Sequence, residues 1–242
     1  MNLHFIGRGA AFNTKEGNNS AYFIENDCLF LIDCGESVFA DLMNNHILSS
    51  IQHIYVIISH THSDHCGSLG SLGFYCQYVL HRKLHIVVPH HETYINSLKT
   101  LMSLFGNSDE AYTFVYEEEI DHVFSSFSSI RYDLTQHDDH LICFSFVFET
   151  HHGAIFYSAD TKTADNMIHF MNTHHDIDRM YMEVTDLKIP DDVHLNIENL
   201  ETVIPLPMRH KVWLMHLRSE ECVKLAQEKK FQIVSRVNNN IS

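Results

Sequence analysis

The sequence has no long apolar run, few prolines and no low-complexity linker. No stretch reaches the roughly 18 consecutive apolar residues of a membrane-spanning helix. Residues 1–4 lack the basic patch and apolar stretch of a signal peptide. We therefore expect a cytoplasmic protein without a membrane partner. With only 4 prolines and no segment that marks a boundary, we expect one domain over residues 1–242.

Basic side chains and paired cysteine motifs are also scarce. The chain has 16 Lys and Arg against 31 Asp and Glu, a formal net charge of −15. Such a chain repels a long polyanion unless its basic residues cluster, so we expect no large nucleic-acid partner. The six cysteines are scattered and form no CxxC pair, which predicts free thiols rather than a disulfide framework or a cysteine metal site.

Short apolar or alternating runs and helical spacings divide the chain into an α/β pattern. Strands are predicted where such runs are bounded by turn residues, at 3–7, 20–25, 28–33, 53–59, 130–135, 143–150, 154–158, 179–184 and 211–216. Helices are predicted where apolar residues return at helical spacing, at 37–47, 90–105, 164–172, 197–204 and 219–230. Two blocks of strands with interspersed helices favour a layered protein with two sheets inside and helices outside.

The most informative segment runs from Val56 to Gly67, where an apolar strand leads directly into His60, His62, Asp64 and His65. Alternate side chains of a strand share a face, so the first two histidines can reach one ion as the strand ends. A turn into a helix would bring the aspartate and the last histidine to a second ion. Imidazole and carboxylate donors suit Zn²⁺, Mn²⁺ or Fe.

This His-x-His-x-Asp-His segment resembles the signature of the metallo-β-lactamase superfamily, whose fold is an αββα four-layer sandwich with a binuclear site between the sheet edges. The other motifs follow in order. By this resemblance Asp33, in the segment 31–35, orders the loop beside the metals without binding them. Asp160, at the end of the segment 156–160, bridges both ions, and His216, after the segment 212–215, is the last ligand.

The third motif of the family offers two histidines, His137 and His140, in the segment 136–140. We favour His137, because it directly follows an apparent strand as the other ligands do, and keep His140 as the alternative. The resemblance then implies two divalent ions, Zn²⁺ or alternatively Mn²⁺, held by His60, His62 and His137 and by Asp64, His65 and His216, with Asp160 shared.

The segments 180–185 and 193–196 resemble the branch of the superfamily that contains ribonuclease Z and small cyclic-nucleotide phosphodiesterases. By this resemblance Glu183 orients His194, and His194 protonates the leaving oxygen as the general acid. Asp64 counts among the catalytic residues as well as the ligands. Hydroxide generated at the metals would attack the phosphorus.

A small phosphodiester, in particular a cyclic nucleotide, is the predicted substrate. Ribonuclease Z usually carries a basic arm between the third motif and the bridging aspartate, whereas 22 residues (138–159) separate His137 from Asp160 here. Transfer-RNA processing by a ribonuclease Z-like activity and hydrolysis of a lactone or thioester stay open as alternatives. Members of this branch commonly pair, so the resemblance also implies a homodimer. We expect the aromatic-rich segments 72–80 and 94–105 to be core or dimer interface.

Overall fold

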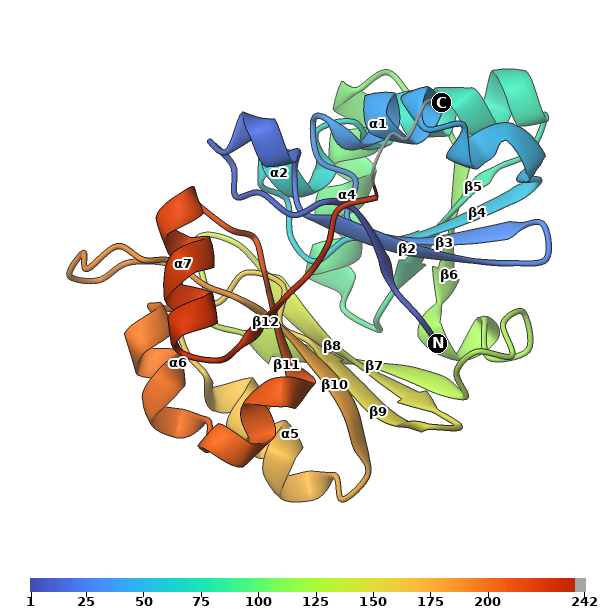
Figure 1. Cartoon of the computed structure of the whole chain (residues 1–242). Coiled ribbons are helices and arrows are strands. Elements are labelled where there is room, and N and C mark those ends of the chain that lie inside the picture. The colour runs from blue at the N-terminus through green and yellow to red at the C-terminus, as the bar shows by residue number, and fades with distance from the viewer. Residues whose placement is uncertain (238–242) are drawn as a thin grey trace.

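The computed structural model describes residues 1–237, which form two six-stranded β-sheets packed face to face. Helices α1 and α4 lie on the outer side of one sheet, and helices α5, α6 and α7 lie on the outer side of the other (Figure 1). The layers therefore run helix, sheet, sheet, helix, and the predicted αββα architecture is confirmed.

The first sheet has the strand order β1-β2-β3-β4-β5-β6. Its first three strands are antiparallel, and β3 to β6 are parallel. The apolar run of β3 is buried from Leu29 to Ile32, as is typical of a parallel strand that is covered on both faces. The strands are β1 (His4–Gly7), β2 (Ser20–Glu25), β3 (Cys28–Ile32), β4 (His53–Ile57), β5 (Leu84–Val88) and β6 (Tyr112–Tyr116).

The second sheet has the strand order β12-β11-β10-β9-β8-β7. Here β7, β8 and β9 are antiparallel, and β9 to β12 are parallel. The strands are β7 (Ser129–Thr135), β8 (Cys143–Thr150), β9 (Gly153–Tyr157), β10 (Ile177–Glu183), β11 (Val212–Met215) and β12 (Gln232–Ile233). Parallel strands bring their carboxyl ends to one edge of each sheet, which is where ligands bind in open α/β sheets.

The helices begin and bury their apolar faces as the sequence predicts. Tyr94, Leu98 and Met102 recur every four residues in α4 and are its buried face. The side chain of Ser219 caps α7 by accepting from the backbone N–H of Cys222 at 3.3 Å. The helices are α1 (Val38–Asn44), α2 (Ser63–Cys66), α3 (Leu69–Tyr75), α4 (Glu92–Leu104), α5 (Asp165–Thr173), α6 (Ile197–Val203) and α7 (Glu220–Glu228).

Aromatic rings fill the space between the two sheets. Phe30 of β3 packs edge-on against Phe124 and Phe148, with ring centroids 5.5 and 6.1 Å apart. A second apolar cluster lies between the second sheet and its helices, where the rings of Phe156 in β9 and Phe170 in α5 have centroids 5.4 Å apart. The two clusters hold the sheets and helices as layers, so the strand ends that carry polar residues have fixed positions.

Several elements differ from the prediction. Three strands, β5, β6 and β12, have no counterpart among the predicted strand ranges, and α2 and α3 divide a segment for which only a turn into a helix was expected. The segment 72–80 contributes the buried Leu72 and Cys76, but it also exposes Tyr78 and Val79, so it is only partly core.

A homodimer stays a prediction. The six cysteines are free thiols, as expected. Within residues 1–237, none of the helices has the length and apolar character needed to cross a membrane.

Candidate metal centre

The carboxyl ends of β4, β9, β10 and β11 carry the polar residues that the sequence singled out. β4 ends at Ile57, and the chain reaches His60 and His62 before α2 begins, so that Asp64 and His65 lie in the short helix itself. Asp160 follows β9 and His216 follows β11, while Glu183 is the last residue of β10. These side chains therefore converge where the edges of the two sheets meet.

Three histidines form the first donor group, His60, His62 and His137, whose ligand nitrogens all lie within 4.8 Å of one another. Nδ1 of His62 is 3.0 Å from Nε2 of His60 and 3.2 Å from Nε2 of His137. Nδ1 of His137 donates to the carbonyl oxygen of Val193 at 2.8 Å, which leaves the Nε2 lone pair directed at the group. Three converging imidazole nitrogens are a typical set of zinc ligands.

A second, fully buried donor group contains two carboxylates and two imidazoles, from Asp64, His65, Asp160 and His216. Nε2 of His216 lies 3.3 Å from Oδ2 of Asp64 and 3.5 Å from Oδ2 of Asp160. Oδ2 of Asp160 is also 3.8 Å from Nε2 of His137. The carboxylate of Asp160 is therefore within reach of both groups, in the position that a bridging ligand would occupy.

Two unpartnered atoms test whether this site fits a cation. Nε2 of His65 and Oδ1 of Asp160 are buried and have no hydrogen-bond partner among the described residues. A buried polar atom without a partner costs stability, and a bound metal ion supplies the missing interaction for both an imidazole nitrogen and a carboxylate oxygen. The donor types and the unpartnered atoms together fit divalent metal ions.

The electrostatics of the cluster also require positive charge. Burial alone would raise the pKa of Asp160, but His216 and His65 hold it well below its ordinary value. Burial disfavours the charged form of His216, yet the carboxylates of Asp160 and Asp64 outweigh this and raise its pKa to about 10. The negative charge of these buried carboxylates favours protonated imidazoles beside them. A bound metal cation can supply the same positive charge in place of the protons.

Asp33 lies beside the donors, as the family resemblance implies. Its Oδ1 accepts from the backbone N–H of Ser59 at 2.7 Å, and its Oδ2 lies 2.8 Å from Nδ1 of His65. The hydroxyl of Ser59 donates to the same carboxylate and lies 3.0 Å from Nδ1 of His60. These contacts fix which ring nitrogen each histidine presents to the centre. Ser59, which the sequence analysis did not select, is recognisable as the residue immediately before the first histidine.

The backbone at the strand ends is strained. Asp33, Ala159 and His216 have left-handed backbone conformations, with φ of 63°, 51° and 53°. Non-glycine residues rarely adopt this region, and such outliers cluster at functional sites. Here each left-handed residue turns the chain sharply after a strand, so that a side chain points into the centre.

The two histidines of the third motif have different environments. His137 is buried and belongs to the first donor group, whereas His140 is exposed and lies in none of the donor groups formed by residues 1–237. The backbone N–H of His140 donates to Oδ1 of Asp138 at 2.7 Å, which forms a turn after His137. The geometry therefore favours His137 as the ligand.

Glu183 and His194 form a pair at the side of the centre. Nδ1 of His194 lies 3.0 Å from Oε2 of the buried Glu183 and 3.8 Å from Oδ2 of Asp160. Burial lowers the pKa of His194, but the charge and hydrogen bond of Glu183, together with the charge of Asp160, outweigh burial and raise it overall. Because the carboxylate engages Nδ1, the other ring nitrogen is left for a proton transfer.

Asp186 and Arg218 are two residues that the sequence analysis missed. They follow β10 and β11 by a few residues and form a bidentate pair, with N–O distances of 2.8 and 2.6 Å. The hydroxyl of Ser219 also donates to Asp186 at 3.3 Å. This pair connects the segment that leads to His194 with the segment after His216. A charged residue shortly after each of two strand ends was the available signal.

Comparisons with known proteins agree with this geometry. The family model described as Anti-Pycsar protein Apyc1 matches residues 1–239. The Anti-Pycsar protein Apyc1 of Bacillus phage BSP38 is 30% identical over an alignment 239 residues long, and the alignment covers 88% of each chain. The metallo-β-lactamase fold protein YhfI of Bacillus subtilis superposes with a TM-score of 0.71 at 19% identity, covering 98% of this chain and 95% of that one.

A transfer-RNA processing enzyme has the same fold. The short form of human tRNase Z superposes with a TM-score of 0.64 at 16% identity, covering 98% of this chain and 97% of that one. At such identities the structural matches establish the metallo-β-lactamase fold alone.

Proposed function

The chain belongs to the Anti-Pycsar protein Apyc1 family, and from this premise we propose that it hydrolyses cyclic nucleotides with two divalent metal ions. The predicted enzyme class, a metal-dependent hydrolase with phosphodiesterase chemistry, is confirmed by the family. The observation that carries the finer proposal is the pair of Glu183 and His194 beside Asp160. A phosphodiester has a poor alkoxide leaving group, and His194, held by Glu183, would serve as the proton donor that such a group needs.

The donor groups supply the proposed ligands. His60, His62 and His137 would hold one ion, and Asp64, His65 and His216 the other, with Asp160 shared between them. When bound, two divalent ions lower the pKa of a water molecule and polarise a phosphoryl oxygen. Zn²⁺ fits the histidine-rich set, and Mn²⁺ accepts the same ligands.

The residues of the chain would then handle the protons and the leaving group. The oxygen of water bonds to phosphorus, the bond from phosphorus to one ribose oxygen breaks, and His194 gives its proton to that oxygen. The proton lost by the water passes to solvent, and the product is a linear phosphomonoester. Glu183 holds Nδ1 of His194 and so aims the opposite nitrogen at the leaving oxygen.

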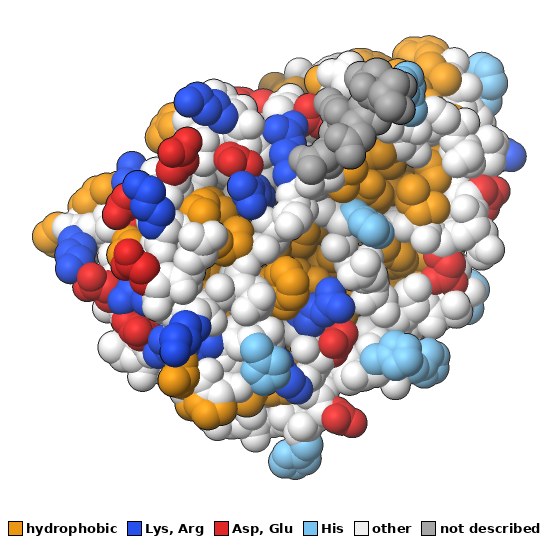
Figure 2. Space-filling model, in the orientation of Figure 1, with side chains coloured by type: hydrophobic (Ala, Val, Ile, Leu, Met, Phe, Trp, Pro, Cys, Tyr) orange, Lys and Arg blue, Asp and Glu red, His pale blue; other side chains and the backbone are white. Residues whose placement is uncertain are grey.

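The charge distribution supports a small substrate. On the face drawn in Figure 2, Lys and Arg side chains are interspersed with Asp and Glu and form no continuous stripe. A folded RNA requires many phosphate contacts from basic residues, whereas the chain has 16 Lys and Arg in all. A single phosphodiester needs only a pocket beside the donor groups.

A substrate screen tests this proposal. Metal-loaded protein, with Zn²⁺ or with Mn²⁺, is incubated with cyclic mononucleotides, cyclic dinucleotides, 2′,3′-cyclic phosphates, a precursor transfer RNA, a lactone and a thioester. We expect the fastest turnover with a cyclic nucleotide. Faster cleavage of the precursor RNA would favour a ribonuclease Z-like activity, and faster cleavage of the lactone or thioester would favour carbon–oxygen or carbon–sulfur hydrolysis.

A further inference from the structure

A small hollow opens directly beside the proposed proton donor. Its lining includes His194 and His216 together with the apolar side chains of Phe12, Leu187 and Ile189. Its volume is about 170 Å³, less than the roughly 300–1,000 Å³ of sites that enclose a whole drug-sized molecule. The hollow can therefore take one flat portion of a ligand whose remainder lies at the metal centre.

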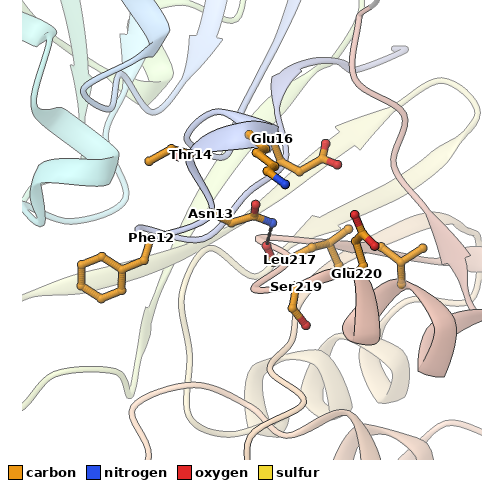
Figure 3. A pocket seen from close by; sticks show the side chains of 9 residues that line it. Phe12, Asn13, Thr14, Glu16, Leu217, Ser219 and Glu220 are labelled. Atoms are coloured by element: carbon orange, nitrogen blue, oxygen red, sulfur yellow. Dashed lines mark hydrogen bonds between the residues drawn. The ribbon is translucent and has the colours of Figure 1, made fainter.

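Phe12 is the most exposed large apolar side chain of the hollow, at 98% of its possible surface. Its loop is nevertheless tied down. Nδ2 of Asn13 donates to the carbonyl oxygen of Leu217 at 2.8 Å, and the backbone N–H of Ala10 donates to the same oxygen at 3.2 Å. Figure 3 shows the Asn13 amide turned toward Leu217 while the ring of Phe12 points away from Glu16 and Leu217.

The anchor of this loop is adjacent to the metal centre in the sequence. The backbone N–H of Leu217 also donates to the carbonyl oxygen of Arg8 at 2.7 Å, and Leu217 directly follows His216. Both the N–H and the C=O of Leu217 therefore bind the loop that carries Phe12, and Leu217 is the residue next to the proposed ligand His216. A side chain on a loop whose backbone is already fixed loses less conformational entropy when it binds a partner.

The segment that carries Leu187 and Ile189 is held by separate contacts. Ile189 is 55% exposed and lies in the segment between β10 and His194. Asn196 donates from Nδ2 to the carbonyl oxygen of Leu187 at 2.6 Å, which closes this segment. Arg218 also lines the hollow, but its guanidinium is occupied by both carboxylate oxygens of Asp186. The hollow therefore offers a ligand mainly apolar surface on this side.

The chemistry of a cyclic nucleotide indicates what fills the hollow. In a cyclic mononucleotide both ester oxygens of the phosphate belong to one ribose, so the oxygen that leaves stays attached to the nucleoside. The group that protonates this oxygen must contact it, and His194 forms part of the wall of the hollow. We propose that the hollow binds the nucleobase, with Phe12 stacking on the base and Ile189 closing the other side. This inference rests on the proposed function and adds the residues that recognise the substrate.

Isolated apolar residues on a surface are common and need no explanation. Two observations set Phe12 apart, namely that it lines the same hollow as His194 and that its loop is fixed to the residue after His216. A second copy of the chain is the other possible occupant of an exposed aromatic ring. That occupant would make the effect of Phe12 depend on association of the protein, which the experiment measures.

The test compares two substrates and four variants. The substrates are a cyclic mononucleotide and the matching cyclic ribose phosphate without a base, which is measured as a substrate or as a competitive inhibitor. For Phe12→Ala we expect KM for the nucleotide to rise about fivefold or more, as for the loss of one base–aromatic stack, with no change for the base-free compound. Phe12→Trp should keep the wild-type KM, and Ile189→Ala should raise it less. Ile24→Ala is the control, because Ile24 is also exposed but lies far along β2 from the site edge.

Distinct results would overturn the inference. It fails if Phe12→Ala leaves KM for the nucleotide unchanged, or if both substrates weaken equally, since the base would then not be the contact. It fails also if light scattering shows that Phe12→Ala changes the molecular mass in solution, which would assign the ring to self-association. Metal content and thermal unfolding show that each variant is folded. If the wild type binds and cleaves neither substrate while fully loaded with metal, the proposed function itself is wrong.

Discussion

Both carboxylate oxygens of Glu183 lie within hydrogen-bonding distance of Nδ1 of His194, at 3.1 and 3.0 Å. The same carboxylate accepts from the backbone N–H of Thr161 at 2.6 Å. Because Thr161 follows Asp160, one buried carboxylate positions both the proposed proton donor and the strand end that serves both donor groups. Loss of this carboxylate should therefore disturb more than one function, whereas loss of the His194 ring should disturb only proton transfer.

Replacement of His194 by alanine tests its role as the general acid. We expect His194→Ala to lower kcat for a cyclic nucleotide about 10²- to 10⁴-fold, the usual contribution of a positioned proton donor. Metal content, measured by mass spectrometry of the elements, should stay at the wild-type value. The loss should be much smaller for a p-nitrophenyl phosphodiester, because p-nitrophenolate leaves without protonation.

His174 provides the matched control for this variant. It is also partly buried and pairs with a glutamate, Glu149, at 3.0 Å from its Nε2, but it lies outside the site. We expect His174→Ala to leave kcat unchanged. A loss of metal from His194→Ala that equals its loss of activity would refute the assignment and make His194 a ligand.

The choice between His137 and His140 can be made by metal stoichiometry. His137→Ala removes a donor from a group of three, so we expect it to bind less metal and to need a higher metal concentration for half-maximal activity. His140→Ala removes an exposed ring that faces solvent, so metal content should not change. Calorimetric titration of the two metal-free variants with Zn²⁺ measures how many ions each binds and how tightly. Reduced affinity in His140→Ala alone would reverse the assignment.

Chelation should destabilise the protein. Metal present at about 100 times its dissociation constant adds about 2.7 kcal/mol to the free energy of unfolding. For a chain of 242 residues this corresponds to a shift in Tm of about 5–10 °C. Since this figure is for one ion and two are proposed, we expect EDTA to lower Tm by at least that amount and added Zn²⁺ or Mn²⁺ to restore it. An unchanged Tm across both treatments, with metal removal verified, would show that the donor groups do not hold ions.

The pair of Asp186 and Arg218 predicts a dependence of stability on pH. Burial opposes the charge of Asp186, but the Arg218 guanidinium outweighs it, so the folded-state pKa lies below the ordinary value of 3.8. A lowered folded-state pKa stabilises the protein above the unfolded-state value, and this contribution disappears as pH falls through the folded-state value. Asp186→Asn should therefore cost about 1 kcal/mol at pH 7.

The pH series is measured by urea unfolding of the wild type and of Asp186→Asn. The difference in the free energy of unfolding should be constant between pH 7 and pH 5 and should shrink below pH 3.8. Asp139→Asn is a suitable control. The carboxylate of Asp139 also pairs with a basic side chain, Lys162, at 3.0 Å, but it is 87% exposed, so its loss should change the free energy of unfolding little. A difference that grows as pH falls would contradict the assigned direction.

The convergence of the candidate ligands was largely predictable because these residues follow strands. A strand that ends in His60 and His62 sends alternate side chains to one face, and the strand ends before Asp160 and His216 meet the same edge of the fold. His137 was favoured over His140 for the same reason, and its burial agrees. The motif after the strand indicated His60 and His62, whereas the family resemblance selected His137, Asp160 and His216. Each of these residues needs only its own strand to be placed.

The remaining features depend on contacts between distant parts of the chain. β12 has two residues and is a strand only through its pairing with β11, and β6 forms at the edge of the first sheet against β5. The loop of Phe12 is positioned by a hydrogen bond between residues 204 positions apart. No local pattern around Phe12 indicates this neighbour, so the hollow beside His194 could not be predicted from the sequence.

The left-handed turns at Asp33, Ala159 and His216 divide the molecule into parts with different freedom to evolve. Turns of this kind persist only where the surrounding structure determines them fully, so most substitutions beside them would misdirect a donor and abolish chemistry. Phe12 and Ile189 are not themselves in such a conformation, and both side chains are exposed. Substitutions at Phe12 and Ile189 should therefore change which nucleobase the proposed hollow accepts while the donor groups stay in place.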